Sequence, residues 1–327
     1  MQKVLIAPAL LAGSEGIYAR VLKEAGFELV YPGLGAQLVE SDILGALTGC
    51  VASLAGSEPY SRKVIEAHPQ LRVIARVGVG YDAVDLPTCA ERNIAVTITP
   101  NTNHDAVAEH TFTLMLALAK NLIPQHLGSV AGRWPRQTTL PLRSQTLGIA
   151  GMGRIGKAVA LRGIAFGMKV IAYDPFPDTA FAKSQGIELV SWENLLKQSD
   201  HLSLHLPSTK ETRHIINRAS IAQMKPTAFL INTARGPLIN EADLAEALAA
   251  KKLAGAGLDV FEQEPPAKDH PLFKFENVVI TPHAAGVDVK SRDDMAASAA
   301  EAIVSLSRGE WPAEKIVNPE IRAKFKW

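Results

Sequence analysis

Short apolar runs alternate with amphipathic segments along the first hundred residues. Four runs have the length and composition of buried strands, namely KVLIA at 3–7, FELVY at 27–31, CVASLA at 50–55 and RVIAR at 72–76. The segments that follow them have helical spacing, at 15–25, 37–47, 61–67 and 85–91. This alternation predicts a parallel sheet covered by helices.

A second series of apolar runs begins at Thr146. It consists of TLGIA, KVIAY, IELV, HLSLHL, AFLIN, GAGLDV and VVIT, and it extends to Thr281. Helical patterns separate the earlier runs, so this series predicts a second parallel sheet. The sequence therefore indicates an α/β protein with two sheets.

Three segments lie outside these series. Residues 103–121 carry apolar side chains on several faces and predict a long, mostly buried helix that connects two domains. Residues 124–145 are rich in Pro, Arg and Gly and predict an extended loop. A helical pattern at 288–308 predicts a helix that returns to the first domain.

Length and composition agree with two folded domains. The 327 residues exceed the size of one ordinary domain, and 47% apolar with 20% charged residues is typical of globular chains. We expect residues 1–100 and 285–327 to form one domain and residues 101–284 to form the other.

Charge and targeting patterns narrow the class of partner. The net charge of +1 arises from 34 basic and 33 acidic residues that are mixed along the chain, so we expect no nucleic-acid or membrane partner but a small molecule. No apolar run approaches the roughly 20 residues of a membrane helix, and the first residues lack a secretory signal. Cys50 and Cys89 have no disulfide or zinc spacing, which predicts reduced thiols, no metal and a cytoplasmic protein.

A glycine-rich turn follows the first strand of the second series. Gly151, Gly153 and Gly156 have GxGxxG spacing between an apolar strand and a helix-forming run. In such a turn the first glycine allows a tight bend, the second allows a pyrophosphate to approach the backbone, and the third allows the helix to pack on its strand. Asp174 ends the next strand at about the expected 20 residues' distance. Its carboxylate would accept hydrogen bonds from the ribose hydroxyls and would repel a 2′-phosphate. The cofactor is therefore predicted to be NAD and not NADP.

Three later segments place chemically active side chains after predicted strands. They are NTARG with Arg235, DVFEQEP with Glu264 and TPHAAG with His283. Because the carboxyl ends of parallel strands line one crevice, we expect these side chains to converge. A histidine suits proton transfer to an alcohol oxygen, a carboxylate can hold the imidazole, and an arginine can bind a substrate carboxylate.

With these motifs the chain resembles the D-isomer-specific 2-hydroxyacid dehydrogenases over nearly its whole length. VGVGYDAVD at 77–85, AVAEH at 106–110, YDP at 173–175 and HLPSTKET at 205–212 add to the resemblance. It implies a flavodoxin-like substrate-binding domain, an NAD-binding Rossmann domain and an active site in the cleft between them. Ala83 departs from the family pattern, in which many members have Asn, and puts a local turn hydrogen bond in doubt.

The resemblance also implies roles for individual residues. Arg235, Glu264 and His283 would be catalytic, and substrate would bind to Arg76, Val77, Gly78, Val79, Arg235 and His283. The cofactor would contact the turn at 151–156 together with Arg154, Ile155, Asp174, Pro207, Thr212, Thr233, Ala234 and Asp259. His205, Asn101 and His110 stay open between a role in the site and a role in strand or helix packing.

The substrate is open between two kinds of acid. Arg76 beside the carboxylate loop favours 3-phosphoglycerate, and an unphosphorylated acid such as glyoxylate or hydroxypyruvate is the alternative. Trp134, in the GRWPR run at 132–136, either reaches a neighbouring subunit's site or packs in an interface, so we expect a homodimer. A non-catalytic, NAD-sensing scaffold of the corepressor type is the alternative from another class, because corepressors share this architecture.

Overall fold

The computed structural model of the chain describes residues 1–33 and 37–327. Within them the chain forms two compact units. The first unit consists of Met1–Asn103 and Val287–Trp327, and the second consists of His104–Gly286. The polypeptide therefore leaves the first unit once and returns to it once.

A five-stranded parallel sheet lies at the centre of the first unit, in the order β2-β1-β3-β4-β5. Its strands are β1 (Lys3–Ile6), β2 (Glu28–Val30), β3 (Cys50–Ala55), β4 (Val73–Arg76) and β5 (Ala95–Thr97). This is the flavodoxin-like order, as expected. β5 is not among the strands predicted from the sequence, although residues 94–98 are a run of apolar and β-branched residues.

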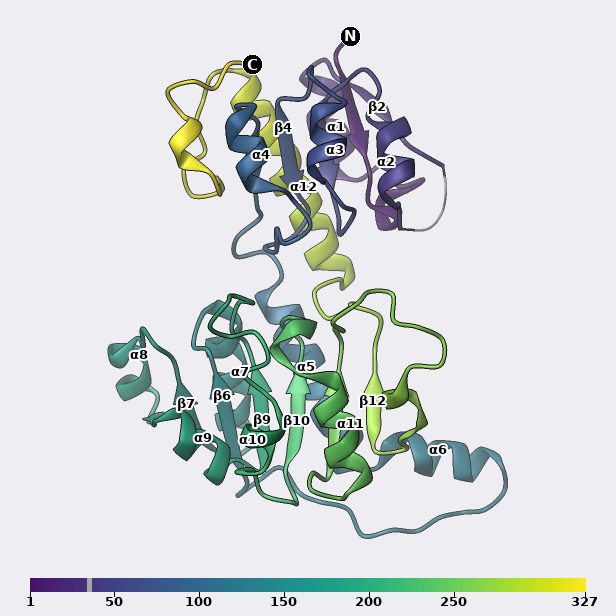
Figure 1. The fold of residues 1–327 in the computed structure, drawn as a ribbon, viewed down its shortest axis with the longest axis vertical. Helices are drawn as coiled ribbons and strands as arrows, with labels where there is room; N and C mark the ends of the chain where they lie inside the picture. The colour runs from purple at the N-terminus through teal and green to yellow at the C-terminus, as the bar shows by residue number, and fades with distance from the viewer. Residues whose placement is uncertain (34–36) are drawn as a thin grey trace. The chain divides into compact units, whose positions relative to one another are not determined.

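Helices cover both faces of this sheet (Figure 1). One face packs against α1 (Ile17–Glu24) and α12 (Val289–Ser307), which bury Leu22 and Ile303. The other face packs against α2 (Glu40–Ala46), α3 (Arg62–Glu66) and α4 (Leu86–Glu91). The helix expected at 288–308 therefore does belong to the first unit.

The C-terminal segment is tied to the free edge of β5. Asn318 is only 2% exposed, and its Oδ1 accepts the N–H of Val96 at 3.0 Å while its Nδ2 donates to the carbonyl of Ile94 at 2.9 Å. The N–H of Val317 also donates to the carbonyl of Val96 at 2.9 Å. One buried amide thus satisfies a donor and an acceptor that an edge strand otherwise leaves unpaired.

The second unit contains a seven-stranded parallel sheet in the order β12-β11-β10-β9-β6-β7-β8. Its strands are β6 (Thr146–Ala150), β7 (Lys169–Tyr173), β8 (Glu188–Leu189), β9 (His201–Leu204), β10 (Phe229–Asn232), β11 (Gly255–Leu258) and β12 (Val278–Ile280). The strand order reverses between β6 and β9, as in a doubly wound dinucleotide-binding fold. The second parallel sheet is therefore confirmed.

Two groups of helices cover this sheet (Figure 1). One face packs against α5 (His104–Ala119) and α7 (Arg154–Ala165). The other face packs against α9 (Trp192–Gln198), α10 (Arg218–Ile221) and α11 (Glu241–Ala249). A further short helix is α8 (Thr179–Ser184).

The segment after α5 differs from the expected extended loop. The predicted helix at 103–121 ends at Ala119, and α6 (Leu122–Val130) begins after Asn121, which has a φ of +49°. Pro124 does not interrupt α6 because it lies in the first turn, where a backbone N–H has no partner within the helix. The expectation of a loop from residue 124 to 130 is therefore wrong, whereas residues 133–140 have no helix or strand.

Three further findings concern the described residues only. No helix among them has the length and apolarity to cross a membrane. Their His, Cys, Asp and Glu side chains form no group that could hold a metal ion. Cys50 and Cys89 are free, buried thiols whose pKa values burial raises, so both stay protonated at neutral pH.

We predict that Asn318→Ala lowers the free energy of unfolding of the chain by about 1–3 kcal/mol, because it leaves a buried donor and acceptor on β5 without partners. Urea denaturation followed by circular dichroism measures this change. Arg322→Ala, an exposed change in the same segment, is the control and should be close to neutral. Equal stability of the two variants would contradict the role of Asn318.

Candidate functional site

The glycine turn lies where the strand order of the second unit reverses. Gly151 follows β6 with a φ of +96°, and a Cβ on it would come within 2.7 Å of the carbonyl oxygen of His205, which follows β9. A Cβ on Gly156 would come within 2.0 Å of the carbonyl oxygen of Gly151. The first and third glycines are therefore required by backbone conformation and by close packing of α7 on its strand.

Gly153 has a different surrounding from its two neighbours. A Cβ on it would have no heavy atom within 4 Å, and the residue is exposed at the N-cap of α7. Arg154 and Ile155 form the first turn of that helix, where backbone N–H groups and the helix dipole favour an anion. Open space in front of these donors fits the pyrophosphate of a dinucleotide.

Asp174 lies directly after β7, beside the glycine turn. Its Oδ2 accepts the N–H of Met152 at 2.7 Å, and its Oδ1 accepts the N–H of Phe176 at 2.8 Å. Asp174 is half-buried, and each carboxylate oxygen retains a lone pair for a ribose hydroxyl. The carboxylate thus also stabilises the glycine turn, which the sequence did not indicate.

The loop after β9 holds the residues expected on the adenosine side of the cofactor. Thr212 donates from its hydroxyl to the carbonyl of Pro207 at 2.6 Å, which closes this loop on itself. His205 pairs its Nε2 with the hydroxyl of Ser203 at 2.9 Å, and burial lowers its pKa to about 3. His205 is therefore neutral, and its carbonyl is the group that contacts the glycine turn.

The loop after β10 carries Arg235. Asn232 is fully buried, and its side chain accepts the N–H of Ala234 at 3.0 Å and donates to the carbonyl of Arg235 at 2.8 Å. Thr233 is also buried, and its hydroxyl pairs with that of Thr111 on α5 at 2.9 Å. The loop is therefore fixed from within and from helix α5.

Gly236 brings this loop against the loop after β11. A Cβ on Gly236 would lie only 1.9 Å from the carbonyl carbon and oxygen of Phe261. No other residue fits at this crossing. As a result the strand-end loops that carry Arg235 and Glu264 lie side by side.

Glu264 and His283 form a hydrogen-bonded pair. The Oε2 of Glu264 lies 2.6 Å from the Nδ1 of His283, and its Oε1 accepts the N–H of Phe261 at 2.9 Å. The two side chains are 31% and 45% exposed, so the pair is open to solvent on one side. His283 has a φ of +52°, a conformation that is uncommon for residues other than glycine.

The charge state of Glu264 determines which nitrogen of His283 is available. Burial alone would raise the pKa of Glu264, but the hydrogen bond and charge of His283, the N–H of Phe261 and the charge of Arg235 together lower it. The carboxylate is therefore ionised at neutral pH and accepts a proton from Nδ1. Nε2, for which the described residues provide no hydrogen-bond partner, remains for proton exchange with a ligand.

Asp259, at the end of β11, is 1% exposed. Its Oδ1 accepts the hydroxyl of Thr281 at 2.6 Å and the N–H of Ala284 at 2.8 Å, and its Oδ2 accepts the N–H of Ala285 at 2.9 Å. These bonds hold the turn that carries His283. The expected contact of Asp259 with the nicotinamide carboxamide stays a prediction.

The first unit has its own loop of predicted binding residues, after β4. The N–H of Val77 donates to the carbonyl of Ala55 at 2.8 Å, and that of Gly78 donates to the hydroxyl of Thr99 at 3.0 Å. Within the described part of the chain, no acceptor takes the N–H of Val79. Among the N–H groups of Val77, Gly78 and Val79, that of Val79 can therefore donate to a bound anion in this conformation.

Arg76 ends β4 and is 8% exposed. Its Nε donates to the carbonyl of Gly80 at 2.8 Å, which closes the 76–80 loop. Glu58 lies on the loop after the neighbouring strand β3 and is 2% exposed. Burial raises the pKa of Glu58, and the positive charge of Arg76 acts in the opposite direction. Ala55 and Arg76 are paired in the sheet register, so the two loops are adjacent.

The second unit brings together the predicted Arg235, Glu264 and His283, with the glycine turn and Asp174 at the carboxyl edge of the same sheet. Sequence reasoning did not assign Asn232, Gly236 or Glu58 to this chemistry. Asn232 is the first residue of the quoted NTARG segment, and an Asn at a strand end is a known loop-closing residue. For Glu58 the sequence offers no signal, because its burial and its partner follow from the fold.

The chain is similar to a known family and to named proteins of that family. The NAD-binding domain of the D-isomer specific 2-hydroxyacid dehydrogenases matches residues 112–285. A glyoxylate reductase of Korarchaeum cryptofilum is 41% identical over 271 residues, which are 81% of this chain and 81% of that protein. A D-3-phosphoglycerate dehydrogenase of Methanocaldococcus jannaschii is also 41% identical, over 91% of this chain and 57% of that protein.

Among solved structures, the D-lactate dehydrogenase of Aquifex aeolicus in complex with NAD and lactic acid is similar with a TM-score of 0.85. It is 31% identical in sequence, and the match covers 97% of this chain and 99% of that one. The similarity therefore includes both units.

The glycine turn gives a matched pair of predictions. Gly156→Ala should lower the free energy of unfolding by about 1–3 kcal/mol, because its Cβ meets backbone. Gly153→Ala should cost less than about 1 kcal/mol, as its Cβ enters open space at an N-cap. The Kd of the Gly153→Ala variant for NADH should nevertheless rise by about tenfold or more, because the added Cβ occupies the space that a pyrophosphate would enter.

Thermal denaturation and fluorescence titration with NADH measure the two effects separately. Unchanged NADH affinity in Gly153→Ala would show that the phosphates do not approach this residue.

Proposed function

Because the chain belongs to the D-isomer-specific 2-hydroxyacid dehydrogenases and uses NAD, we propose that it interconverts a short, unphosphorylated 2-oxo acid and its D-2-hydroxy acid. Glyoxylate and hydroxypyruvate represent this class of substrate. The observation that carries the proposal is the Glu264–His283 pair beside the charge of Arg235. The scaffold alternative does not need such a pair.

NAD, when bound at the glycine turn, would supply the hydride chemistry needed at C2 of the substrate. Arg235 binds the substrate carboxylate and polarises the adjacent carbonyl. His283 gives the proton on Nε2 to the carbonyl oxygen during reduction and accepts it again during oxidation. Glu264 stays ionised and holds Nδ1, so that the imidazole keeps its orientation while Nε2 exchanges the proton. In the first unit, we propose the backbone N–H of Val79 as a donor for an anionic group of the substrate.

The surroundings of Arg76 favour an unphosphorylated substrate. A phosphate needs cations beyond the one that binds the carboxylate, and Arg76 is the cation the sequence offers for it. However, Arg76 is buried, donates to the carbonyl of Gly80 and is faced by the buried Glu58. Arg76 therefore already has a hydrogen-bond acceptor and a nearby carboxyl group within its own unit. We accordingly reverse the preference for 3-phosphoglycerate that the sequence suggests.

Oxidation of 3-phosphoglycerate is the second candidate. It is favoured by the position of Arg76 next to the 77–79 loop and by the phosphoglycerate dehydrogenase among the relatives. In that case Arg76 would exchange its internal contacts for the phosphate.

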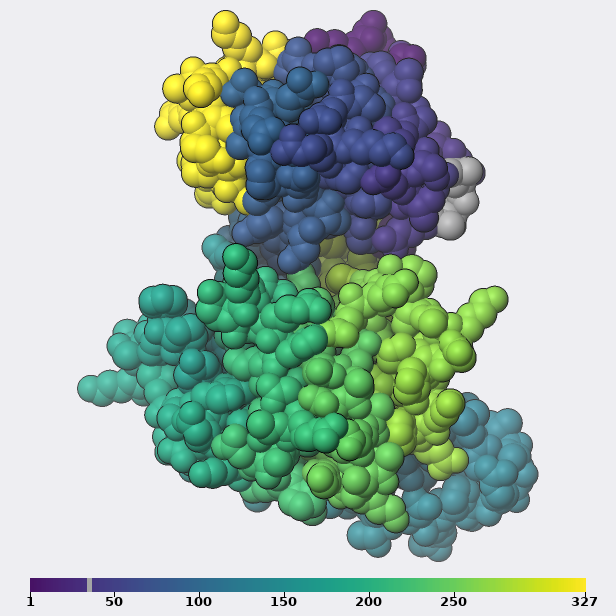
Figure 2. All heavy atoms as spheres, viewed as in Figure 1, coloured from purple at the N-terminus to yellow at the C-terminus, as the bar shows by residue number. Residues whose placement is uncertain are grey.

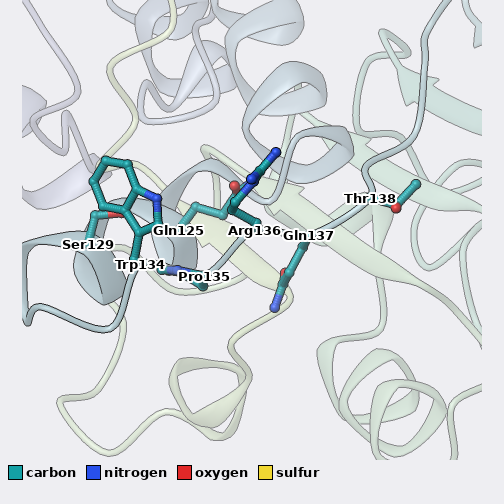
Figure 3. Close-up of a pocket in the computed structure, with 7 residues that line it drawn as sticks. All are labelled: Gln125, Ser129, Trp134, Pro135, Arg136, Gln137 and Thr138. Carbon is teal, nitrogen blue, oxygen red and sulfur yellow. The ribbon is translucent and has the colours of Figure 1, made fainter.

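A homodimer is the proposed form of the enzyme. Ile123, Leu127 and Val130 share one face of α6 at helical spacing and are 42%, 58% and 75% exposed. Trp134, 75% exposed, lines a shallow pocket with residues of α6 and of the segment that follows it (Figure 3). In Figure 2 this part of the second unit projects from the body of that unit. An exposed apolar stripe of this kind is typical of a protein interface, and a second copy of the chain is the occupant we propose.

The enzymatic proposal predicts NADH oxidation with a panel of 2-oxo acids. We expect turnover of glyoxylate and hydroxypyruvate, with kcat/KM about 10²–10⁴ times lower in His283→Ala because the proton donor is lost. Absorbance at the NADH band follows the reaction. Absence of turnover with every acid of the panel, phosphohydroxypyruvate included, would contradict the proposal.

The same assay ranks the two substrates. Wild-type kcat/KM for hydroxypyruvate should exceed that for phosphohydroxypyruvate by about tenfold or more, as loss of about 1.4 kcal/mol of transition-state binding implies. Glu58→Gln removes the charge that faces Arg76 and should narrow the gap, whereas Glu66→Gln, an exposed change in the same unit, should not. A preference for phosphohydroxypyruvate in the wild type would establish the second candidate instead.

The dimer proposal predicts a mass of two chains in light scattering at micromolar concentration. The double variant Leu127→Glu, Val130→Glu should shift the mass to one chain, because it places charges in an apolar interface. Phe176→Glu is the control. It changes a side chain that is 90% exposed and lies outside α6, so it should leave the dimer intact. A monomeric wild type would refute this part of the proposal.

A further inference from the structure

Three consecutive backbone N–H groups point at one residue in the turn that carries His283. The N–H of His283 donates to the carbonyl oxygen of Asp259 at 2.8 Å, that of Ala284 donates to Oδ1, and that of Ala285 donates to Oδ2. Two of these amides bind the carboxylate as in an anion-binding nest, and the third binds the backbone carbonyl of the same residue. His283 adopts a φ of +52° within it, a conformation that costs free energy for a residue with a Cβ. Asp259 therefore holds His283 in this conformation through its backbone carbonyl, which binds His283 directly, and through its carboxylate, which binds the two residues that follow.

The orientation of that carboxylate is set by a chain of hydrogen bonds from helix α5. Oδ1 of Asp259 lies 2.6 Å from the hydroxyl of Thr281, and that hydroxyl lies 2.9 Å from Nε2 of His110. A carboxylate only accepts, so Thr281 donates its single proton to Asp259. Its oxygen then accepts from His110, which must carry a proton on Nε2. The chain has one direction, from His110 through Thr281 to Asp259.

The next residue of α5 makes the corresponding contact with the other loop. Thr111 donates its hydroxyl to the carbonyl of Val107 at 2.8 Å, so its oxygen accepts the proton of the Thr233 hydroxyl at 2.9 Å. Thr233 lies two residues before Arg235. Adjacent residues of one rigid helix are therefore bonded to both strand-end loops of the proposed reaction.

We propose that His110 and Thr111 of α5, through Thr281 and Thr233, are positioning residues that fix His283 and Arg235 relative to each other. This inference rests on the proposed function, in which those two side chains act on one substrate. Reaction of a substrate held by two groups depends on their mutual placement to within a fraction of an ångström. A buried helix that bonds to both loops supplies such a reference more rigidly than either loop alone.

Paired variants at residue 281 test the inference. Thr281→Val keeps the shape of the side chain but has no hydroxyl, whereas Thr281→Ser keeps the hydroxyl. In Thr281→Val we expect kcat to fall about tenfold to hundredfold while the KM for NADH is unchanged. Thr281→Ser should restore kcat to near the wild-type value. Thr113→Val, which removes a hydroxyl bonded only to the backbone of α5, is the control and should retain full activity.

A second pair addresses the helix. His110→Gln retains a side-chain N–H that can donate to Thr281, and His110→Phe does not. We expect His110→Gln to keep most of the activity and His110→Phe to reproduce the loss seen in Thr281→Val. Equal losses of activity in both variants would show that the imidazole ring contributes only packing and does not orient the hydrogen bonds from Thr281 to Asp259.

Hydrogen–deuterium exchange of the 283–285 amides gives a readout that does not require turnover. These amides should exchange about tenfold faster in Thr281→Val and His110→Phe than in the wild type, with unchanged exchange in β6. Unchanged exchange of the three amides in both variants would overturn the inference even if the wild type is active. A wild type without turnover but with accelerated exchange in the variants would instead overturn the proposed function and leave the bonding chain established.

Discussion

The buried carboxylate of Asp259 is the interaction on which the proposed acid/base group depends. An ionised group with 1% exposure is costly unless donors surround it, and here one hydroxyl and two N–H groups do so. All these donors come from the turn between Thr281 and Ala285. The same bonds that make the burial of this charge tolerable therefore fix the backbone of His283 and, with it, the hydrogen bond to Glu264.

The parallel sheet supplies the surrounding constraint. Loops at the carboxyl ends of β6, β7, β9, β10 and β11 share one edge, and glycine at two crossings lets them approach within backbone contact. Gly151 admits the carbonyl of His205, and Gly236 admits the backbone of Phe261. Open space remains at Gly153, in front of the first turn of α7, where the fold offers backbone donors to a pyrophosphate. Within one short turn, Gly151 and Gly156 are closely packed and Gly153 between them leaves space for a ligand.

Sequence reasoning predicted the two sheets, the glycine turn and the Arg235, Glu264 and His283 set, because these depend on local periodicity and on strand-end position. It did not include β5, although residues 94–98 are apolar and β-branched, and it replaced α6 with a loop, since Pro124 is tolerated in the first turn of a helix. The role of Arg76 as a cation for phosphate stays a prediction, and the fold adds a contact that bears on it. Glu58, whose pKa the charge of Arg76 affects, is 18 positions earlier in the sequence and lies near Arg76 only because β3 and β4 are neighbours.

Hydride transfer to C2 of a 2-oxo acid, with a proton delivered by His283, is the central claim. Reduction of hydroxypyruvate with NADH that carries deuterium at the transferred position of C4 tests it most directly. The expected product is D-glycerate with one deuterium on C2, detected by proton NMR and chiral separation, and His283→Gln should form it about 10²–10⁴ times more slowly. L-Glycerate, product without deuterium at C2, or equal product from His283→Gln would contradict it.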